Sequence, residues 1–308
     1  MPCASPRKWL PLQAAPTKTI VAIAAAWLRS VLLSVMPHSR NWTLSDIPWG
    51  HFQAARVDPD VLKVVKAAAM VERNGADYGR YLCNVFADDP TFCDLARTWA
   101  TEEEQHGIAL GRWAELADPN YKFDSAFQQF RDLYQIPVDA TASVRGSRTG
   151  ELCARCVVET GTSSFYSALR DGVDEPVLKA ICAKIAADEF RHYKLFLNAM
   201  QRYSTHEPLS VAARLRIALG RMNEADDDEL ASAYFAGNAL PGPYDRNASA
   251  AAYSARAFGF YRQRHTKRAG HMIAQAVGLS PDGVFGQLMQ KVMWLVIGFM
   301  GRRFRTAA

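Results

Sequence analysis

"TEEEQHG", residues 101–107, places three carboxylates and a histidine within about two turns of a predicted helix. Like charges at helical spacing repel one another, by a few tenths of a kcal/mol per pair on an exposed helix. Glu103 and His106 are three residues apart, so their side chains leave the helix on the same side. Glu-x-x-His on one helix is a known way to offer two ligands to a metal ion. The stretch therefore indicates either a metal-binding helix or a solvated acidic face.

A second Glu-x-x-His pair, Glu189 and His192, favours the metal-binding interpretation. Glutamate occupies 12 of 308 positions, so about 0.3 of the seven histidines should follow a glutamate at this spacing by chance. Two histidines do so. Each pair also has a further glutamate about one helical hairpin upstream, since Glu72 lies 31 residues before Glu103 and Glu159 lies 30 residues before Glu189.

These six residues match the ligand set of a two-metal carboxylate site in a helical bundle, with one glutamate from each of two helices and Glu-x-x-His from each of the other two. The predicted ligands are Glu72, Glu103, His106, Glu159, Glu189 and His192. Carboxylate and imidazole ligands suit two iron ions, with manganese or a mixed manganese and iron pair as the alternative. The competing interpretation is that all six are surface charges or hydrogen-bonded core groups.

Neighbouring residues extend the predicted site. Glu102 and Asp188 each precede a ligand glutamate, and each is expected to accept the remaining imidazole N–H of the opposite motif. Glu104 is expected to face solvent. Thr162 and Ser163 follow Glu159 by three and four residues, so either hydroxyl could hydrogen-bond to oxygen held at the metals or simply bond back to its own helix.

The pattern of apolar residues predicts an all-α protein, a four-helix bundle with one long crossover plus additional helices. The expected helices span residues 58–87, 91–116, 151–171, 176–203, 210–223, 229–236, 249–276 and 284–305, with the crossover at 117–150. The expected organisation is an arm at 1–45, a metal-binding bundle at 46–208 and C-terminal helices at 209–308. The apolar segment 292–300, "VMWLVIGFM", is expected to pack in the core, because nine residues cannot span a bilayer.

The charge and the cysteines restrict the class of protein. All of the net charge of +5 lies in the arm, because five basic residues precede Asp46 and the rest of the chain has 31 basic and 31 acidic residues. We expect no nucleic-acid partner. Six scattered cysteines are not the framework of a small secreted protein and are consistent with a cytoplasmic protein. Cys153 and Cys156 form a single C-x-x-C, which we interpret as ordinary helix residues.

The arm contains an apolar run at residues 19–36, interrupted by Arg29. A transmembrane span is disfavoured by this arginine, and a signal peptide by the lack of a small-residue cleavage site. An amphipathic helix could lie on the protein or on a membrane surface. Its apolar side would carry Ile20, Ile23, Ala24, Trp27 and Val31.

Two segments, "RTWATEEEQHG" at 97–107 and "ICAKIAADEFRHYKLF" at 181–196, resemble the second and fourth helices of the soluble acyl-carrier-protein desaturases, which belong to the ferritin-like superfamily. Glu159 followed by Thr162 is similar to their third helix. The resemblance covers residues 58–200 and implies two irons that activate O2 and oxidise an unactivated carbon chain. It also implies a ferredoxin-like electron donor and an acyl-carrier protein or another acyl or small-molecule substrate.

Other functions fit the same ligands. A related di-iron oxygenase could hydroxylate or N-oxygenate another substrate, and a rubrerythrin-like or bacterioferritin-like protein could handle iron or peroxide. Such iron-handling bundles are usually shorter, so the extra hundred residues favour an enzyme with a substrate. A metal-free scaffold or membrane-surface partner is the remaining alternative. The sequence leaves the oligomeric state open, with a homodimer as one option.

Overall fold

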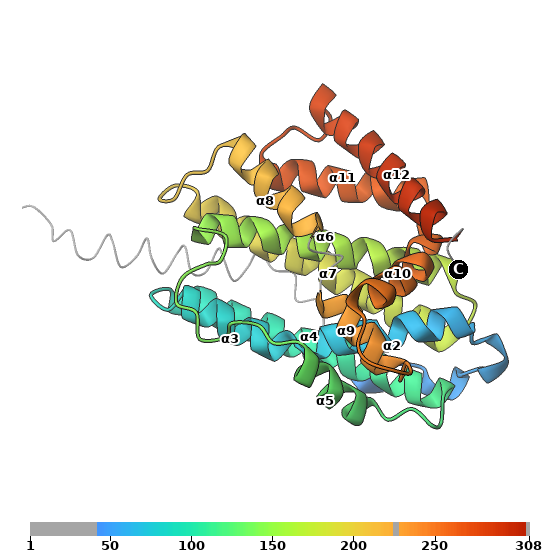
Figure 1. Ribbon diagram of the computed structural model, residues 1–308. Helices are drawn as coiled ribbons and strands as arrows, with labels where there is room; N and C mark the ends of the chain where they lie inside the picture. Colours follow the sequence, from blue (N-terminus) through green and yellow to red (C-terminus); the bar gives the residue numbers. More distant parts are fainter. Residues whose placement is uncertain (1–41, 224–227, 306–308) are drawn as a thin grey trace, which may run out of the picture. The chain divides into compact units, whose positions relative to one another are not determined.

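The computed structural model describes residues 42–223 and 228–305, and in these ranges every regular element is a helix (Figure 1). The short 3₁₀ helices are η1 (Leu44–Asp46), η2 (Trp49–His51), η3 (Ala54–Arg56) and η5 (Phe258–Phe260). The first α-helices are α2 (Pro59–Arg73), α3 (Gly75–Val85), α4 (Pro90–Ala117), α5 (Phe123–Leu133), α6 (Arg148–Gly172) and α7 (Pro176–Tyr203). The remaining ones are α8 (Val211–Asn223), α9 (Asp228–Gly237), α10 (Arg246–Ala257), α11 (Gln263–Val277) and α12 (Val284–Arg305). The expected all-α class is confirmed.

Three long helices begin with the same local device, an acidic residue followed by proline. The Asp58 side chain accepts hydrogen bonds from two backbone N–H groups of the first turn of α2, and Asp89 and Glu175 cap α4 and α7. Proline fits the first helical position because its missing N–H would have no partner there. The side-chain cap satisfies N–H groups that the helix itself leaves free. These sequence signals fix the starts of α2, α4 and α7.

Two helices expected to be continuous are interrupted. The helix predicted at 58–87 is divided into α2 and α3 at Asn74, whose φ and ψ of −77° and 1° leave the helical region. Asn-Gly is a common turn signal, and a Cβ on Gly75 would lie 2.4 Å from Glu103 Cβ, so the break occurs where α4 is closest. The helix predicted at 249–276 is divided into α10, η5 and α11 by an extended residue, Tyr261. The apolar pattern continues through both breaks, which is why it did not reveal them.

The helices that carry the predicted ligands pack as two pairs. Helices α2 and α3 pack on α4, α6 packs on α7, and α4 contacts α7 to join the pairs. Helix α5 lies in the crossover between α4 and α6. The C-terminal helices cover this assembly, since α9 packs on α2, α11 on α6, α10 on α9 and α12 on α10 and α11 (Figure 1). A core cluster that includes Phe92, Leu152 and Phe196 fills the space between α3, α4, α6 and α7.

The apolar run at 19–36 and most of the arm lie outside the described residues. The expectation that 292–300 packs in the core holds for one side of the described part, where Met293 is buried in a core cluster, and is wrong for the other side, where Val292, Leu295 and Val296 are exposed. Helix α12 thus has an apolar outer side as well as an apolar inner side. Across residues 42–223 and 228–305, the helices are too short or too polar to cross a bilayer.

Candidate metal centre

Two glycines allow α2 and α3 to approach α4 closely at the predicted site. A Cβ on Gly107 would lie 2.5 Å from the backbone nitrogen of Arg73, and Gly75 makes the similar contact with Glu103. Real Cβ atoms do not tolerate such distances, so any larger residue would force the helices apart. Gly107 follows His106 directly, and Arg73 follows Glu72. The close contact therefore brings the first predicted glutamate beside the first predicted histidine.

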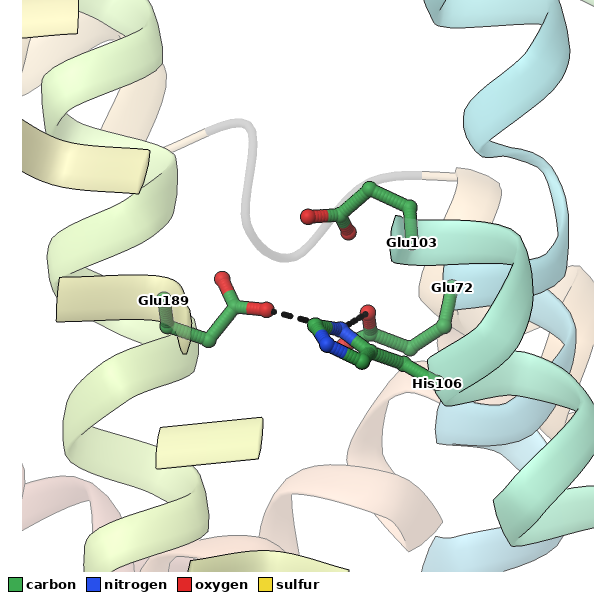
Figure 2. A group of neighbouring side chains, drawn as sticks. All are labelled: Glu72, Glu103, His106 and Glu189. Atoms are coloured by element: carbon green, nitrogen blue, oxygen red, sulfur yellow. Dashed lines mark hydrogen bonds and ion pairs between the residues drawn. The ribbon is translucent and has the colours of Figure 1, made fainter. Parts of the chain in front are cut away.

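The six predicted ligands meet in two overlapping groups of four. Glu72, Glu103, His106 and Glu189 form one group, in which one ligand atom per residue lies within 4.8 Å of the others (Figure 2). The second group meets the same criterion and consists of Glu103, Glu159, Glu189 and His192. All six side chains are buried. Glu103 and Glu189 belong to both groups, so their carboxylates could contact an ion in either group, whereas each of the other four ligands belongs to one group only.

Both imidazoles present the same nitrogen to this centre. Nδ1 of His106 lies 3.3 Å from Glu72 Oε2 and 3.2 Å from Glu189 Oε1. Nδ1 of His192 lies 2.9 Å from Glu103 Oε1 and 3.6 Å from Glu159 Oε2. The two rings are stacked with their centroids 5.8 Å apart. The arrangement is therefore nearly symmetric, with one histidine and one unshared glutamate on each side of two shared glutamates.

Several buried atoms at the centre lack hydrogen bonds, although other buried carboxylates of this protein are well satisfied. Glu151 accepts hydrogen bonds from Tyr81 and Ser143, and Glu175 from Trp113 Nε1 and two backbone N–H groups. By contrast, no described residue hydrogen-bonds to one oxygen of Glu103, one of Glu189 or either of Glu159. The 2.9 Å contact from His192 Nδ1 to Glu103 lacks hydrogen-bond geometry. Buried polar atoms without partners are costly, so these atoms fit the role of metal ligands.

The charge of the ligands fits two divalent cations. Four glutamates carry four negative charges when ionised, and neutral imidazoles add none. Two divalent ions neutralise this set, whereas one would leave two buried negative charges, which is expensive in a site of low dielectric constant. Carboxylate and imidazole ligands without thiolate suit iron or manganese. The residues present therefore fit a pair of such ions.

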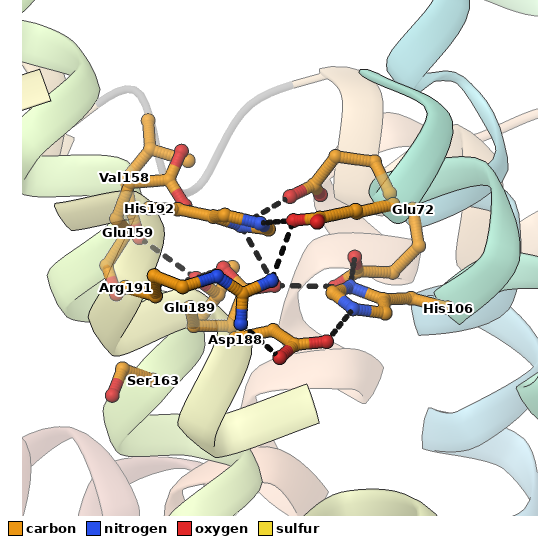
Figure 3. Close-up of polar contacts among 12 residues, drawn as sticks. Glu72, His106, Val158, Glu159, Ser163, Asp188, Glu189, Arg191 and His192 are labelled. Atoms are coloured by element: carbon orange, nitrogen blue, oxygen red, sulfur yellow. Dashed lines mark hydrogen bonds and ion pairs between the residues drawn. The ribbon is translucent and has the colours of Figure 1, made fainter. Parts of the chain in front are cut away.

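Glu102 and Asp188 each contact the histidine of the other motif. Figure 3 shows Asp188 beside His106 and Arg191. Asp188 of α7 lies 3.1 Å from Nε2 of His106 on α4, and Glu102 of α4 lies 2.6 Å from Nε2 of His192 on α7. Arg191 donates to both carboxylates, at 2.5 Å to Asp188 and 2.7 Å to Glu102. The sequence predicted that each carboxylate would contact the histidine of the other motif. It did not predict that Arg191 would donate to both carboxylates. Each ring is thereby held with Nδ1 directed at the centre.

We expect Asp188→Asn to weaken iron binding about 10- to 100-fold, because the amide is a poorer acceptor for His106 N–H and leaves Arg191 with one carboxylate fewer. Glu104→Gln is the matched control. Glu104 is the residue after the predicted ligand Glu103 on α4, but its carboxylate pairs with Arg73 away from the centre. Anaerobic titration with ferrous iron measures both affinities. Equal weakening in the two variants would show a general effect of lost negative charge and contradict the orienting role.

The pKa values at the centre show that protons occupy it when metal is absent. Burial, followed by repulsion from Glu189, raises the pKa of Glu159 to about 8. Burial alone would lower the pKa of His106, but the close carboxylates of Asp188, Glu189 and Glu72 outweigh it, so the pKa lies well above its usual range. The pKa of His192 is raised in the same way by Glu102, Glu103 and Glu159, against the effect of burial.

A divalent cation that binds here has to displace these protons, so the affinity for such an ion, tested with ferrous iron, should depend on pH. Below pH 8 the Glu159 carboxyl is protonated in the metal-free protein, and the affinity should rise with pH by up to about tenfold per unit for each proton released. Titrations at about pH 6.5, 7.5 and 8.5, with a pH indicator to count protons, measure this. An affinity that does not change over this range would contradict a binding site that is protonated when empty.

The two predicted hydroxyls lie in different places. Thr162 Oγ1 donates to Glu189 Oε2 at 2.5 Å and lines a pocket beside the centre. Ser163 Oγ instead donates to the backbone carbonyl of Ala186 at 3.3 Å, away from the carboxylates (Figure 3). Tyr166 was not among the predicted site residues, and its buried hydroxyl donates to Glu72 Oε1 at 2.6 Å. Tyr166 follows Glu159 by two helical turns, and this spacing was the available signal.

A pocket of about 310 Å³ lies beside the centre, bounded by α2 and α6 and covered by the C-terminal helices. Four ligands, Glu72, Glu103, Glu159 and Glu189, form part of its wall. Most of the remaining wall is apolar or aromatic and includes Phe165, Tyr166, Tyr253, Phe258, Tyr261, Ile273, Met293 and Ile297. The pocket is therefore a largely apolar space in direct contact with the carboxylates.

One part of the pocket wall is polar. Arg155 lies one helical turn before Glu159, with its guanidinium 4.6 Å from the centre of the Tyr78 ring. Tyr78 donates to Glu229 Oε2 at 2.9 Å, and the other oxygen of Glu229 makes no hydrogen bond to any described residue. Burial raises the pKa of Glu229, against the charges of Arg221 and Arg155. A hydrogen-bonding group of a ligand could therefore be bound about 6 Å along α6 from a metal ligand.

No protein-family model matches the chain, and no curated protein matches it.

Proposed function

We propose that this protein is a ferritin-like di-iron oxidoreductase that activates O2 and oxidises an unactivated carbon of an apolar substrate. The observation that carries the proposal is the pair of four-ligand groups that share Glu103 and Glu189 beside an apolar pocket. Four long helical segments supply the ligands, and a crossover with one short helix separates the two pairs. This order and this ligand set are those of ferritin-like two-metal proteins. The resemblance of residues 58–200 to soluble acyl-carrier-protein desaturases points to the same class.

When bound, two ferrous ions would supply the electrons and the Lewis acidity for O2 reduction. The residues of the chain would hold and orient them. Glu103 and Glu189 would fix the spacing of the ions, and Asp188 and Glu102 would keep the histidine rings aligned. Tyr166 would hold Glu72, and Thr162 would hold the far oxygen of Glu189 at the pocket wall. The apolar wall would exclude water from the reacting carbon.

The pocket supports a substrate with a substantial apolar part. An acyl chain presented by an acyl-carrier protein, with electrons from a ferredoxin-like donor, is the substrate system that the resemblance favours. Iron or peroxide handling alone would not require an apolar space of this size in contact with the ligands. The pocket therefore favours substrate oxidation over iron handling.

A related oxygenase that hydroxylates or N-oxygenates a smaller molecule is the second candidate. The polar wall formed by Tyr78, Arg155 and Glu229 favours it, because these groups could bind a hydrogen-bonding substituent close to the centre. A long unsubstituted chain would leave Glu229 and Arg155 without a ligand partner. Product analysis distinguishes the two candidates, since one yields a double bond and the other an added oxygen atom.

The test combines metal analysis with substrate-dependent O2 consumption. We expect about two irons per chain, the number that the ligand charges balance. The reduced protein should consume O2 faster when acyl substrates or small aromatic amines are added, with products identified by mass spectrometry. Ala257→Trp, which fills the pocket wall on α10, should abolish this acceleration while keeping the iron content. The proposal would be contradicted if the protein bound no iron, or if none of the added substrates changed its rate of O2 consumption.

A further inference from the structure

The inner side of helix α12 packs against other helices of the protein. It packs on α10 and α11, and a Cβ on Gly270 of α11 would lie 2.8 Å from the Cα of Gln290, so the two helices touch backbone to backbone there. Met293 is buried, and Met293 and Ile297 form part of the pocket wall. The inner side therefore fixes the position of α12 and leaves its outer side without a partner among the described residues.

The outer side of α12 is a continuous apolar stripe. Its exposed residues are Val284, Phe285, Leu288, Val292, Leu295 and Val296. At 3.6 residues per turn these six share an arc of about 120°, which is as wide as the core-facing side of a typical amphipathic helix. Phe285 is 71% exposed and Leu295 is 63% exposed. An exposed stripe of this kind marks a contact surface.

The charge of this region is entirely positive. No acidic residue follows Asp282, whereas Lys291, Arg302, Arg303 and Arg305 are basic. The surface that α12 contacts should therefore be apolar and carry negative charge. A second copy of α12 would bring the same apolar stripe but also the same positive charge, with no acid to pair with it. Charge complementarity therefore disfavours a symmetric pairing of two α12 helices.

We propose that the outer side of α12 docks on the surface of an anionic lipid bilayer, with the helix parallel to the membrane plane. Its apolar side chains would enter the boundary between head groups and acyl chains, and the net positive charge of the segment would be attracted to anionic head groups. A bilayer supplies both features that the stripe requires. Val296 is half-exposed and also lines the pocket, so the docking face and the pocket wall meet at this residue. The docking itself does not depend on the metal chemistry.

Sedimentation of the full chain with vesicles tests the proposal. We expect binding to vesicles of phosphatidylcholine with about one third phosphatidylglycerol, weaker binding to phosphatidylcholine alone, and loss of binding at high salt. Leu295→Glu should lower the partition coefficient at least about tenfold, because it removes an inserted leucine and adds a repelled charge. Leu219→Glu is the matched control, since Leu219 on α8 is 59% exposed but is not on this stripe. Circular dichroism checks that both variants keep their helices.

Three outcomes would overturn the proposal. The wild-type chain could fail to sediment with anionic vesicles. Leu295→Glu could bind as tightly as wild type, which would assign any membrane binding to another part of the chain, such as the arm. Alternatively, the protein could fail to bind vesicles and form a dimer in sedimentation equilibrium. If Leu295→Glu but not Leu219→Glu dissociated this dimer, the stripe would be an interface between two copies of the chain. Iron content is measured in parallel, so a failure of docking is distinguishable from a failure of the di-iron proposal.

Discussion

Glu189→Ala should empty both metal positions, whereas Glu72→Ala should leave about one iron per chain. Glu189 and Glu103 belong to both four-ligand groups, while Glu72 belongs only to the group that contains His106. Removal of a shared glutamate takes a ligand from each ion and leaves the four-carboxylate set one charge short. Removal of Glu72 leaves Glu103, Glu159, Glu189 and His192 intact as a complete group. Iron analysis of anaerobically loaded, desalted protein gives the two stoichiometries.

Glu159→Ala provides the reciprocal control, because it removes the unshared glutamate of the other group and should also leave about one iron. Far-ultraviolet circular dichroism should give helical spectra for all three variants, since apolar contacts such as those of the core around Phe92 and Leu152 do not involve the ligands. If Glu72→Ala lost both irons and Glu189→Ala kept one, the assignment of shared and unshared ligands would be wrong.

Removal of iron should lower the melting temperature substantially. At a free metal concentration about 1,000 times the Kd, one bound ion stabilises the folded state by about 4 kcal/mol. For a protein of 308 residues, with an unfolding entropy of about 2.1 cal/mol/K per residue, that is a shift of about 6 °C, and a second ion should add to it. The metal-free protein keeps buried carboxylates close together without enough hydrogen-bond donors, as shown by the raised pKa of Glu159 and by its two oxygens, neither of which has a hydrogen bond to a described residue. Calorimetry before and after chelation measures the shift.

Glu159→Leu separates the cost of the buried carboxylate from the benefit of the metal. In the metal-free state this variant should melt at a higher temperature than wild type, because leucine replaces a buried carboxylate whose two oxygens have no hydrogen bond to a described residue. In the presence of iron the order should reverse, because the variant has lost a ligand. A melting temperature that is the same with and without iron in the wild type would indicate that the centre does not bind metal in the folded protein.

The ligand set could be predicted from the sequence because each Glu-x-x-His pair is local to one helix. A spacing of three residues determines that Glu103 and His106, or Glu189 and His192, point the same way whatever the rest of the chain does. The repeat of about 30 residues between each upstream glutamate and its partner reflects two helices joined by a short turn. Glu102 and Asp188 followed from the same local geometry. The all-helical class rested on equally local patterns of apolar residues.

Contacts between distant segments could not be predicted in this way. Arg191 was visible in the sequence, but its role in joining Glu102 to Asp188 requires α4 and α7 to lie at a particular distance. The pocket draws its wall from six or more helices, and its polar part joins Tyr78, Arg155 and Glu229 from three of them. The exposure of one side of α12 was not predicted, because the sequence of an apolar helix is the same whether one or both of its sides are buried.

The sequence by itself determined that this is a helical protein with six potential metal ligands at helical spacing, because helix formation and side-chain direction depend on neighbours within a few residues. Only the tertiary structure decided which glutamates are shared, which hydroxyl reaches the centre and where the apolar pocket lies. These properties depend on how far apart packed helices sit, and that distance is set by contacts such as Gly75 and Gly107 against the opposite helix, whose partners lie tens of residues away in the chain.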